Sequence, residues 1–213
     1  MTDVTVIDYD CGNLFSVCRA IEVFERSYEL TCDPDKIAKA DRLILPGVGA
    51  FGSARVALDR LGLVEAIYAF VKTGRPFLGI CLGMQLLFDT SEEFGEHDGL
   101  GLIAGKVTAI PPLREDGKRR CIPNIGWYPI TPPHITRWQA TLLRDTAPGE
   151  YMCFVHSFVG SPSASNDILA VAEYDGLEFC AAVSHDNITG IQFHPEKSGT
   201  EGLSLINTFF QDG

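Results

Sequence analysis

The sequence predicts an α/β fold with a central, mostly parallel sheet flanked by helices and an additional antiparallel portion. In the first half, short apolar runs are each followed by a turn and then by a segment whose apolar residues have helical spacing. In the second half, short apolar pieces alternate with Gly and Pro, which is typical of antiparallel strands with long connections. The 213 residues contain no interdomain linker, so we expect one domain over 1–213.

Three strand–loop–helix units make up the first half. Each strand is a short apolar or β-branched run, and each helix has apolar residues three and four positions apart. Because parallel strands end at the same edge of a sheet, we expect ligand chemistry at their C-terminal ends. The expected strands are Val4–Tyr9, Arg42–Leu45 and Pro76–Ile80, and the expected helices are Leu14 to about Tyr28, Phe51–Gly62, Leu63–Lys72 and a segment after Cys81 whose helical pattern reaches Phe88.

The second half predicts short strands and one closing helix. Between Gly99 and Ile130 the apolar pieces are short and are separated by Gly and Pro. Within this region the charged stretch Arg114–Arg120 is expected to form a solvated hairpin tip. Further strands are expected at Tyr151–Val155, Ile168–Tyr174, Leu177–Val183 and Ile188–Phe193, and a helix at Gly202–Phe210.

Composition and charge argue against several classes of protein. The chain is 46% hydrophobic and 21% charged, as in ordinary soluble globular proteins. A formal net charge of −11 argues against a nucleic-acid surface, which neutralises phosphates with Lys and Arg. No apolar run approaches the roughly 18 residues of a membrane span, and the first residues do not resemble a signal peptide. We therefore expect no nucleic acid and no membrane as partners, and a cytoplasmic location.

The cysteines indicate neither a disulfide framework nor a metal site. Seven are scattered along the chain without a CxxC pair. We expect no metal and no cofactor. Cys81 has a special position, because it lies between the apolar strand Pro76–Ile80 and a helical segment and has Gly two residues before and after it. This is the pattern of a nucleophile elbow, in which the following helix favours the thiolate. A buried Cys that ends an ordinary strand–helix unit is the alternative.

A thiolate nucleophile needs a base that an acid orients, and one of the five histidines fits this role best. His194 follows a strand and precedes Pro195, whose preference for an extended neighbour allows His194 and Glu196 to project to the same side. We expect His97 and His134 at the surface and His185 in a hairpin turn, without a catalytic part.

Acyl transfer also needs hydrogen-bond donors for the oxyanion. The backbone N–H of Leu82, one residue after the nucleophile, is placed for this by the elbow. A second donor is expected from Pro46–Gly49, a turn at another strand end, where the glycines would let a peptide rotate. A simple turn between strand and helix remains the alternative for this stretch.

Two motifs together resemble the class I, triad-type glutamine amidotransferases, which share a flavodoxin-like fold: Gly79–Gln85 and Gln192–Glu196. The resemblance runs from about Val4 to Phe209. Further stretches are similar to the glutaminase subunits of imidazole glycerol phosphate synthases: Asp8–Leu14, Leu45–Gly52, Gly126–Trp127, Phe154–Ser157 and Glu196–Gly199.

The resemblance implies that L-glutamine is hydrolysed to glutamate and ammonia through a thioester on Cys81, with His194 as base and then acid and Glu196 as its orienting group. It implies that ammonia passes to a cyclase subunit, a (β/α)8 barrel, in a heterodimer. The implied substrate-binding residues are Gly47, Gly49, Leu82, Gln85, His156, Ser157 and Phe158, and the implied partner contacts are Asn13, Trp127 and Lys197.

Three positions depart from the family pattern. Asn124 stands where a His is usual, Tyr128 where an Asn is usual, and Phe158 where a Tyr is common. The sequence also leaves alternatives open: the glutaminase of another synthase, a non-catalytic domain of the same architecture, or a stand-alone cysteine hydrolase that acts on γ-glutamyl peptides.

Overall fold

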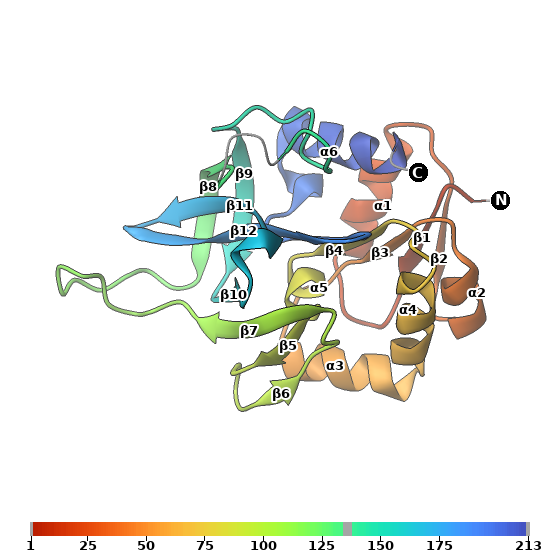
Figure 1. Cartoon of the computed structure of the whole chain (residues 1–213), viewed down its shortest axis with the longest axis horizontal. Coiled ribbons are helices and arrows are strands. Elements are labelled where there is room, and N and C mark those ends of the chain that lie inside the picture. The colour runs from red at the N-terminus through yellow and green to blue at the C-terminus, as the bar shows by residue number, and fades with distance from the viewer. Residues whose placement is uncertain (1, 134–137, 212–213) are drawn as a thin grey trace.

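The computed structural model describes residues 2–133 and 138–211. Figure 1 shows one large sheet crossing the molecule, with helices on both faces and a smaller sheet beside it. Among the described residues, the large sheet has the strand order β2-β1-β3-β4-β13-β12-β11-β8-β9 and the small sheet has the order β10-β7-β5-β6. The order places strands together that are far apart in the sequence, and this decides where the site forms.

The parallel part of the large sheet begins with strands from the first half of the chain and then takes one from its end. The pairs β2–β1, β1–β3, β3–β4 and β4–β13 are all parallel. The first four strands and the last are β1 (Val4–Ile7), β2 (Tyr28–Thr31), β3 (Leu43–Leu45), β4 (Phe77–Ile80) and β13 (Ile188–Ile191). The residues of β1, β3 and β4 are all buried, as expected for strands covered on both faces.

The antiparallel part continues from β13 through β12, β11 and β8 to β9. Its strands are β8 (Asn124–Thr131), β9 (Tyr151–His156), β11 (Ile168–Tyr174) and β12 (Leu177–His185). Buried and exposed residues alternate along β9, so one of its faces reaches the surface.

A second, four-stranded sheet packs below the first in Figure 1. Its strands are β5 (Phe88–Ser91), β6 (His97–Asp98), β7 (Ile103–Ala109) and β10 (Phe158–Pro162). The β10–β7 and β5–β6 pairs are antiparallel, but β5 and β7 pair in parallel.

Helices cover both faces of the large sheet and bury two apolar cores (Figure 1). One core includes Val17, Ile21, Ile206 and Phe209 from the helices α1 and α6, and the other includes Phe51, Leu58, Ile67 and Phe70 from α3 and α4. The helical elements are α1 (Leu14–Glu22), α2 (Pro34–Lys39), α3 (Phe51–Arg60), α4 (Leu63–Val71), α5 (Leu82–Gln85), η1 (Ser165–Asp167), η2 (Pro195–Lys197) and α6 (Gly199–Gln211).

The fold class is confirmed, and two predicted helices are too long. The first helix ends at Glu22, and Tyr28 instead begins β2, which pairs with β1. The helix after Cys81 ends at Gln85, and Phe88 begins β5. In both cases a segment with helical spacing pairs with a neighbouring strand and forms a strand itself. The spacing within a single segment does not show that such a partner is present. The sequence prediction also missed α2, β6 and β10, and His97 lies in β6 where a loop was expected.

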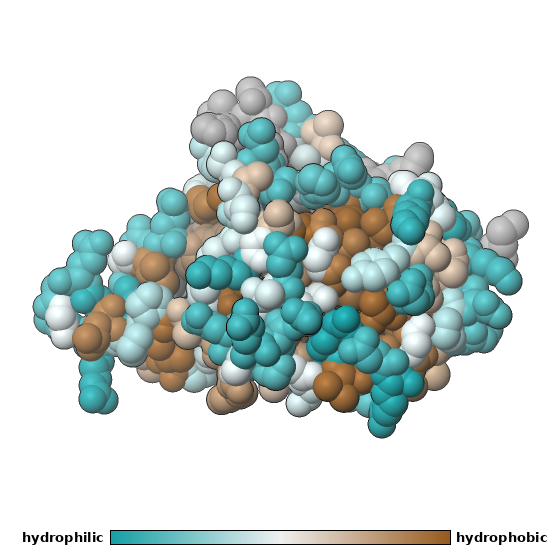
Figure 2. Space-filling view, turned by 60° about the horizontal axis from the view of Figure 1, so that its bottom comes forward, coloured by the Kyte–Doolittle hydropathy of each residue, from teal (hydrophilic) through white to brown (hydrophobic). Residues whose placement is uncertain are grey.

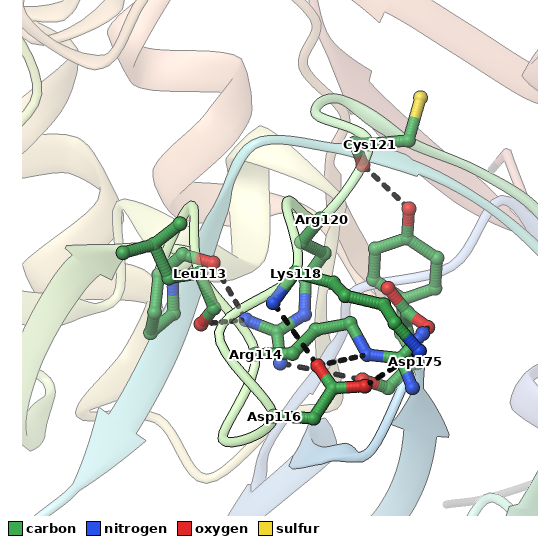
Figure 3. Close-up of polar contacts among 9 residues, drawn as sticks. Leu113, Arg114, Asp116, Lys118, Arg120, Cys121 and Asp175 are labelled. Carbon is green, nitrogen blue, oxygen red and sulfur yellow. Dashed lines mark hydrogen bonds and ion pairs between the residues drawn. The ribbon is translucent and has the colours of Figure 1, made fainter.

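The charged loop between β7 and β8 is a hairpin at its tip, as predicted, but one of its arginines is buried. Leu113 and Arg119 form a bridge, and the Arg114 N–H donates to the Lys118 carbonyl. Arg120 is only 8% exposed and donates to the carbonyl groups of Pro111, Leu113 and Asp175. Figure 3 shows Arg114 and Arg120 converging on Asp175, in the turn between β11 and β12. The two arginines therefore fasten the loop that leads into β8.

The surface mixes polar and apolar areas. Figure 2 shows brown apolar areas between hydrophilic residues on the face that it presents. Within residues 2–133 and 138–211, no helix is both long and apolar enough to cross a bilayer.

Candidate active site

The candidate site forms where the adjacent parallel strands β4 and β13 end. Ile80 of β4 pairs with Ile191 of β13, and the Cys81 N–H donates to the Ile191 carbonyl at 2.8 Å. The residues that follow both strands consequently lie at one edge of the sheet. This pairing brings Cys81 and His194 together across more than a hundred intervening residues.

Cys81 has the strained backbone of a nucleophile elbow. Its φ of 54° and ψ of −108° are unusual for a residue with a side chain. The helix α5 begins at the next residue, and the side chain is 6% exposed. A Cβ on Gly83 would collide with the Leu45 carbonyl oxygen of β3, so glycine is needed there for the close approach of helix and strand. These features confirm the predicted elbow.

His194 lies between the sulfur and a carboxylate. Its Nδ1 is 2.8 Å from Glu196 Oε1, and the two side chains are 4% and 1% exposed. Glu196 Oε2 is buried without a hydrogen-bond partner. Cys81 is also close enough to the ring to raise the pKa of His194. Since Nδ1 faces Glu196, the other ring nitrogen is the one left for the sulfur. The predicted association of residues 81, 194 and 196 is present in the structure.

The surroundings of His194 favour its protonated form. Burial by itself would lower the pKa of the imidazole, but the hydrogen bonds and charges of Cys81 and Glu196 outweigh burial and raise that pKa above its usual range. A protonated ring beside the sulfur is the arrangement that a cysteine nucleophile requires of its base.

The backbone of β9 and η2 fixes the position of His194. The His194 N–H donates to the Cys153 carbonyl at 2.9 Å, and the Ser198 hydroxyl donates to the His194 carbonyl at 2.6 Å. The same hydroxyl accepts the Cys153 N–H at 2.9 Å. Ser198 therefore ties the histidine segment to β9, the strand that ends at His156.

The expected oxyanion donor is occupied. The Leu82 N–H donates to the Gly47 carbonyl at 3.3 Å, so this oxygen lies where a substrate oxyanion would accept that bond. Gly47 is closely surrounded, and an added Cβ would meet the Tyr9 hydroxyl and Leu82 Cβ. Gly49 has a φ of +108° and open space around it. In this conformation the Pro46–Gly49 turn closes the oxyanion site.

A cavity of about 290 Å³ opens over the sulfur. Most of the predicted substrate-binding residues line it, with Gly47 outside the lining set. Glu93 also lines the cavity, and its Oε2 accepts the Phe51 N–H at 2.6 Å. The lining residues are Val48, Gly49, Cys81, Leu82, Gln85, Glu93, Pro123, Val155, His156, Ser157, Phe158, His194 and Lys197.

His156 has an internal role that the sequence did not indicate. Its Nδ1 is 2.9 Å from the Phe158 carbonyl oxygen, and its Nε2 is 3.0 Å from Asn124 Nδ2. Burial, reinforced by the charge of His194, lowers the pKa of His156 to about 4 in spite of its bond to Phe158. The ring is therefore neutral, with Nδ1–H as donor and Nε2 as acceptor. Asn124, where the family usually has His, supplies the matching donor.

The three predicted partner contacts differ in exposure. Trp127 is 50% exposed on β8, Lys197 is exposed and lines the cavity, and Asn13 is half-buried and accepts a bond from Ser16. On the same face as Trp127 lie Ile125, Tyr151 and Val155, all exposed; we call these four residues the β8–β9 apolar strip. Because Val155 also lines the cavity, the strip is continuous with the mouth of the cavity.

His97 and His185 lie outside the site. The ring of His97 is half-buried against Gly52, and His185 is paired with Asp167 at 2.9 Å at the end of β12. His134 lies outside the described residues. Among the residues that the structure describes, no group of three or more His, Cys, Asp or Glu side chains is arranged to hold a metal ion.

Two site residues were missed or undervalued in the sequence. Glu93 lies in an acidic turn, Ser91–Glu96, with no motif that marks it as different from a solvated loop. Gln192 was noted only as part of a motif, although its side chain contacts Cys81. A polar residue directly after the apolar strand β13 was the available signal.

Comparison with known sequences gives matches over nearly the whole chain. The profile of the family described as glutamine amidotransferase class-I matches residues 5–212. "Imidazole glycerol phosphate synthase subunit HisH 1" of Legionella pneumophila (strain Lens) is 45% identical over 212 residues, or 99% of this chain and 100% of that protein. "Imidazole glycerol phosphate synthase subunit HisH" of Syntrophotalea carbinolica is 45% identical over 207 residues, or 97% and 98%.

Solved structures share the fold. The structure of PurLQS from Thermotoga maritima superposes with a TM-score of 0.71, 20% identity and 99% coverage of both chains. A crystal structure described as glutamine amidotransferase has a TM-score of 0.72 with 15% identity and covers 97% of both chains. These likenesses confirm the predicted α/β architecture.

Proposed function

The chain belongs to the class-I glutamine amidotransferase family, and we propose that it is the glutaminase subunit of an imidazole glycerol phosphate synthase. One observation carries the glutaminase chemistry: Cys81, His194 and Glu196 meet at the ends of the adjacent strands β4 and β13. Relatives named as this subunit are 45% identical to the chain over nearly its full length, which supports the assignment to that synthase. A single domain carries the site.

The reaction proceeds through a thioester. The Cys81 thiolate attacks the γ-amide carbon of L-glutamine, and the negative charge moves to the carbonyl oxygen. His194 gives its proton to the amide nitrogen, which leaves as ammonia, while Glu196 holds the ring. His194 then removes a proton from water, the hydroxide attacks the thioester carbon, and glutamate departs as the sulfur takes up its negative charge again.

The cavity offers complementary groups for the polar ends of glutamine. The Glu93 carboxylate is an acceptor for the α-ammonium group, and Lys197 is the cation available to the α-carboxylate. The Phe158 carbonyl already accepts from His156 and Gln85, so Ser157 and Phe158 bind substrate through their other groups.

Rotation of one peptide links the oxyanion site to activity. Turning the Gly47–Val48 peptide would withdraw the Gly47 carbonyl from the Leu82 N–H and present the Val48 N–H in its place. Two donors would then face the oxyanion. The closed conformation supports a glutaminase that is nearly silent until a partner shifts this turn, which prevents wasteful release of ammonia.

The partner in this proposal is a cyclase subunit, a (β/α)8 barrel that docks on the β8–β9 apolar strip and forms a heterodimer. An enclosed route is needed because free ammonia at neutral pH is mostly protonated and not nucleophilic. The cyclase adds the ammonia to a ribulosyl-aminoimidazole nucleotide and gives imidazole glycerol phosphate and an aminoimidazole carboxamide ribotide for histidine biosynthesis.

Seven unpaired cysteines fit a reducing, cytoplasmic setting. Tyr128 packs inward against Phe154 and Tyr174, so its departure from the family leaves the outward face of the strip intact.

Partner-dependent turnover tests the proposal. We expect the purified chain to hydrolyse glutamine slowly, and addition of the cyclase with its nucleotide substrate to raise the rate by orders of magnitude. A fully active isolated chain would instead support a stand-alone hydrolase on γ-glutamyl peptides. No turnover under either condition would support a non-catalytic domain, and activation by the partner of another synthase would support that other assignment.

A further inference from the structure

Gln192 is a buried polar residue in contact with the nucleophile. It follows β13 directly, and none of its surface is exposed. Its Nε2 is 3.7 Å from Cys81 Sγ, within the range of an N–H···S hydrogen bond, and its Oε1 is 3.0 Å from Gln85 Nε2. Both ends of this amide therefore have partners inside the site.

The direction of the bond to the sulfur follows from the neighbouring contacts. Gln85 lies 3.1 Å from the Phe158 carbonyl oxygen, which can only accept, so Gln85 must present its NH₂ group there. The same Nε2 faces Gln192, so Gln192 must present its oxygen to Gln85. Only the NH₂ group of Gln192 is then left for the sulfur.

The geometry points to Gln192 as a further catalytic residue, whose side-chain amide donates a hydrogen bond to the Cys81 thiolate. This inference rests on the proposed glutaminase reaction. The uncharged thiol can instead donate its own hydrogen toward the Val155 carbonyl oxygen, 4.0 Å away. An N–H donor stabilises the thiolate more than the thiol, because hydrogen bonds to charged acceptors are the stronger ones.

The donor acts at two points of the reaction. It helps to form the nucleophile before attack, and it stabilises the same sulfur when it leaves the second tetrahedral intermediate with its electron pair. In the thioester the sulfur carries no charge, and the bond weakens. No proton moves from Gln192 at any stage. His194 and Gln192 thus both act on the sulfur, His194 as a proton carrier and Gln192 as a fixed dipole.

The orientation of Gln192 is set outside the triad. The Phe158 carbonyl that directs Gln85 also accepts from the neutral ring of His156, whose other nitrogen accepts from Asn124. One chain of hydrogen bonds consequently runs from β8 to the sulfur. This explains why an amide side chain, rather than an apolar one of similar size, occupies a fully buried position.

Two variants of the full-length chain test the role of the donor. Gln192→Leu removes both polar ends, whereas Gln192→Glu keeps an acceptor for Gln85 but places a carboxylate near the sulfur. We expect the midpoint of the pH profile for alkylation of Cys81 by iodoacetamide to move upward by about one unit in both variants. Mass spectrometry of the Cys81 peptide separates this thiol from the six others. In the assembled synthase we expect kcat for glutamine to fall about 10- to 100-fold, with KM within about twofold for Gln192→Glu.

Thr208→Val is the matched control, because it also removes a buried polar group, 2% exposed, but on α6. Its Cys81 profile should equal that of the wild type. Folded Gln192 variants with an unchanged profile would overturn the inference. If neither variant folds, ¹⁵N-labelled wild type decides: the Gln192 side-chain amide resonance should move when Cys81 is alkylated, and a fixed resonance would contradict the bond. Wild type that never turns over glutamine would instead refute the proposed function, whatever the profile.

Discussion

Two regions around the cavity are built in opposite ways. At the ends of β4 and β13 the polar side chains are buried and paired, with His194 and Glu196 only 4% and 1% exposed. On the β8–β9 apolar strip, Ile125 and Trp127 are 66% and 50% exposed. The difference indicates that the candidate catalytic groups are assembled within this chain, whereas the strip leaves apolar area exposed, as proposed docking surfaces do.

The Pro46–Gly49 turn shares features of both regions, because part of it is buried and paired and part is exposed. Its Gly47 carbonyl holds the Leu82 N–H, but Val48 and Gly49 are exposed at the cavity. A partner that covers Val48 could therefore alter the oxyanion site without touching the triad. On this view, docking controls how well an existing nucleophile can work.

Removing the nucleophile should give the largest effect, and it tests whether the buried site and the apolar strip have separate roles. Cys81→Ala should lower glutamine-dependent synthesis by roughly 10⁴-fold or more, because no thioester can form. Added ammonium salt should still support synthesis by the complex, since the strip is untouched. Steady-state assays with either nitrogen source measure this, with Cys32→Ala as an exposed control. Loss of both activities would contradict separate sites.

A milder change in the triad tests the pairing of His194 with Glu196. Glu196→Gln should lower kcat by about 10²- to 10⁴-fold, because the ring loses its anionic partner. The variant should also lower the pKa of His194, since Glu196 is one of the groups that raise it.

The effect on stability has a defined sign. Because the pKa of His194 is raised on folding, its contribution is fully present below the unfolded value of about 6.5 and is lost as pH rises through the folded value. In Glu196→Gln the contribution should be smaller, and its loss should be complete at lower pH. Ring titration by NMR and unfolding at several pH values check both statements, and an unchanged titration would argue against the pairing.

Trimming the apolar strip addresses the other region. Trp127→Ala should weaken binding of the cyclase about 30-fold, as expected for a large aromatic side chain at an interface, and leave the alkylation of Cys81 unchanged. Val56→Ala, on α3 and 66% exposed, is a control outside the strip. Calorimetric titration with the cyclase measures the affinity, and equal affinities for the two variants would remove Trp127 from the interface.

The buried His156 is tested through the pH dependence of stability. Its pKa is lowered to about 4 in the folded chain. Between about pH 6.5 and pH 4 the unfolded chain therefore binds a proton at this ring and the folded chain does not, so stability falls as pH drops through this range. Between roughly pH 7.5 and pH 5, wild type should lose about 2 kcal/mol more than His156→Gln. Urea unfolding at both pH values measures the difference, and parallel losses would show that His156 is not held neutral.

Local patterns were sufficient for the elements that carry the chemistry. Glycines on both sides of Cys81 predicted a strand-to-helix elbow, and Pro195 predicted that His194 and Glu196 share a side; both features are present. Such features depend on the backbone limits of one short segment. Periodicity failed at Tyr28 and Phe88, because a neighbouring strand recruited segments whose spacing also suited a helix.

By itself, the sequence determined the fold class and singled out Cys81, His194 and Glu196 as the candidate reactive groups, since these follow from spacing over a few residues. Only the tertiary structure decided that β13 pairs with β4, that Glu93 reaches the cavity and that Gln192 faces the sulfur. Those contacts join residues far apart along the chain, and their free energy comes from burial and strand pairing that no single segment contains.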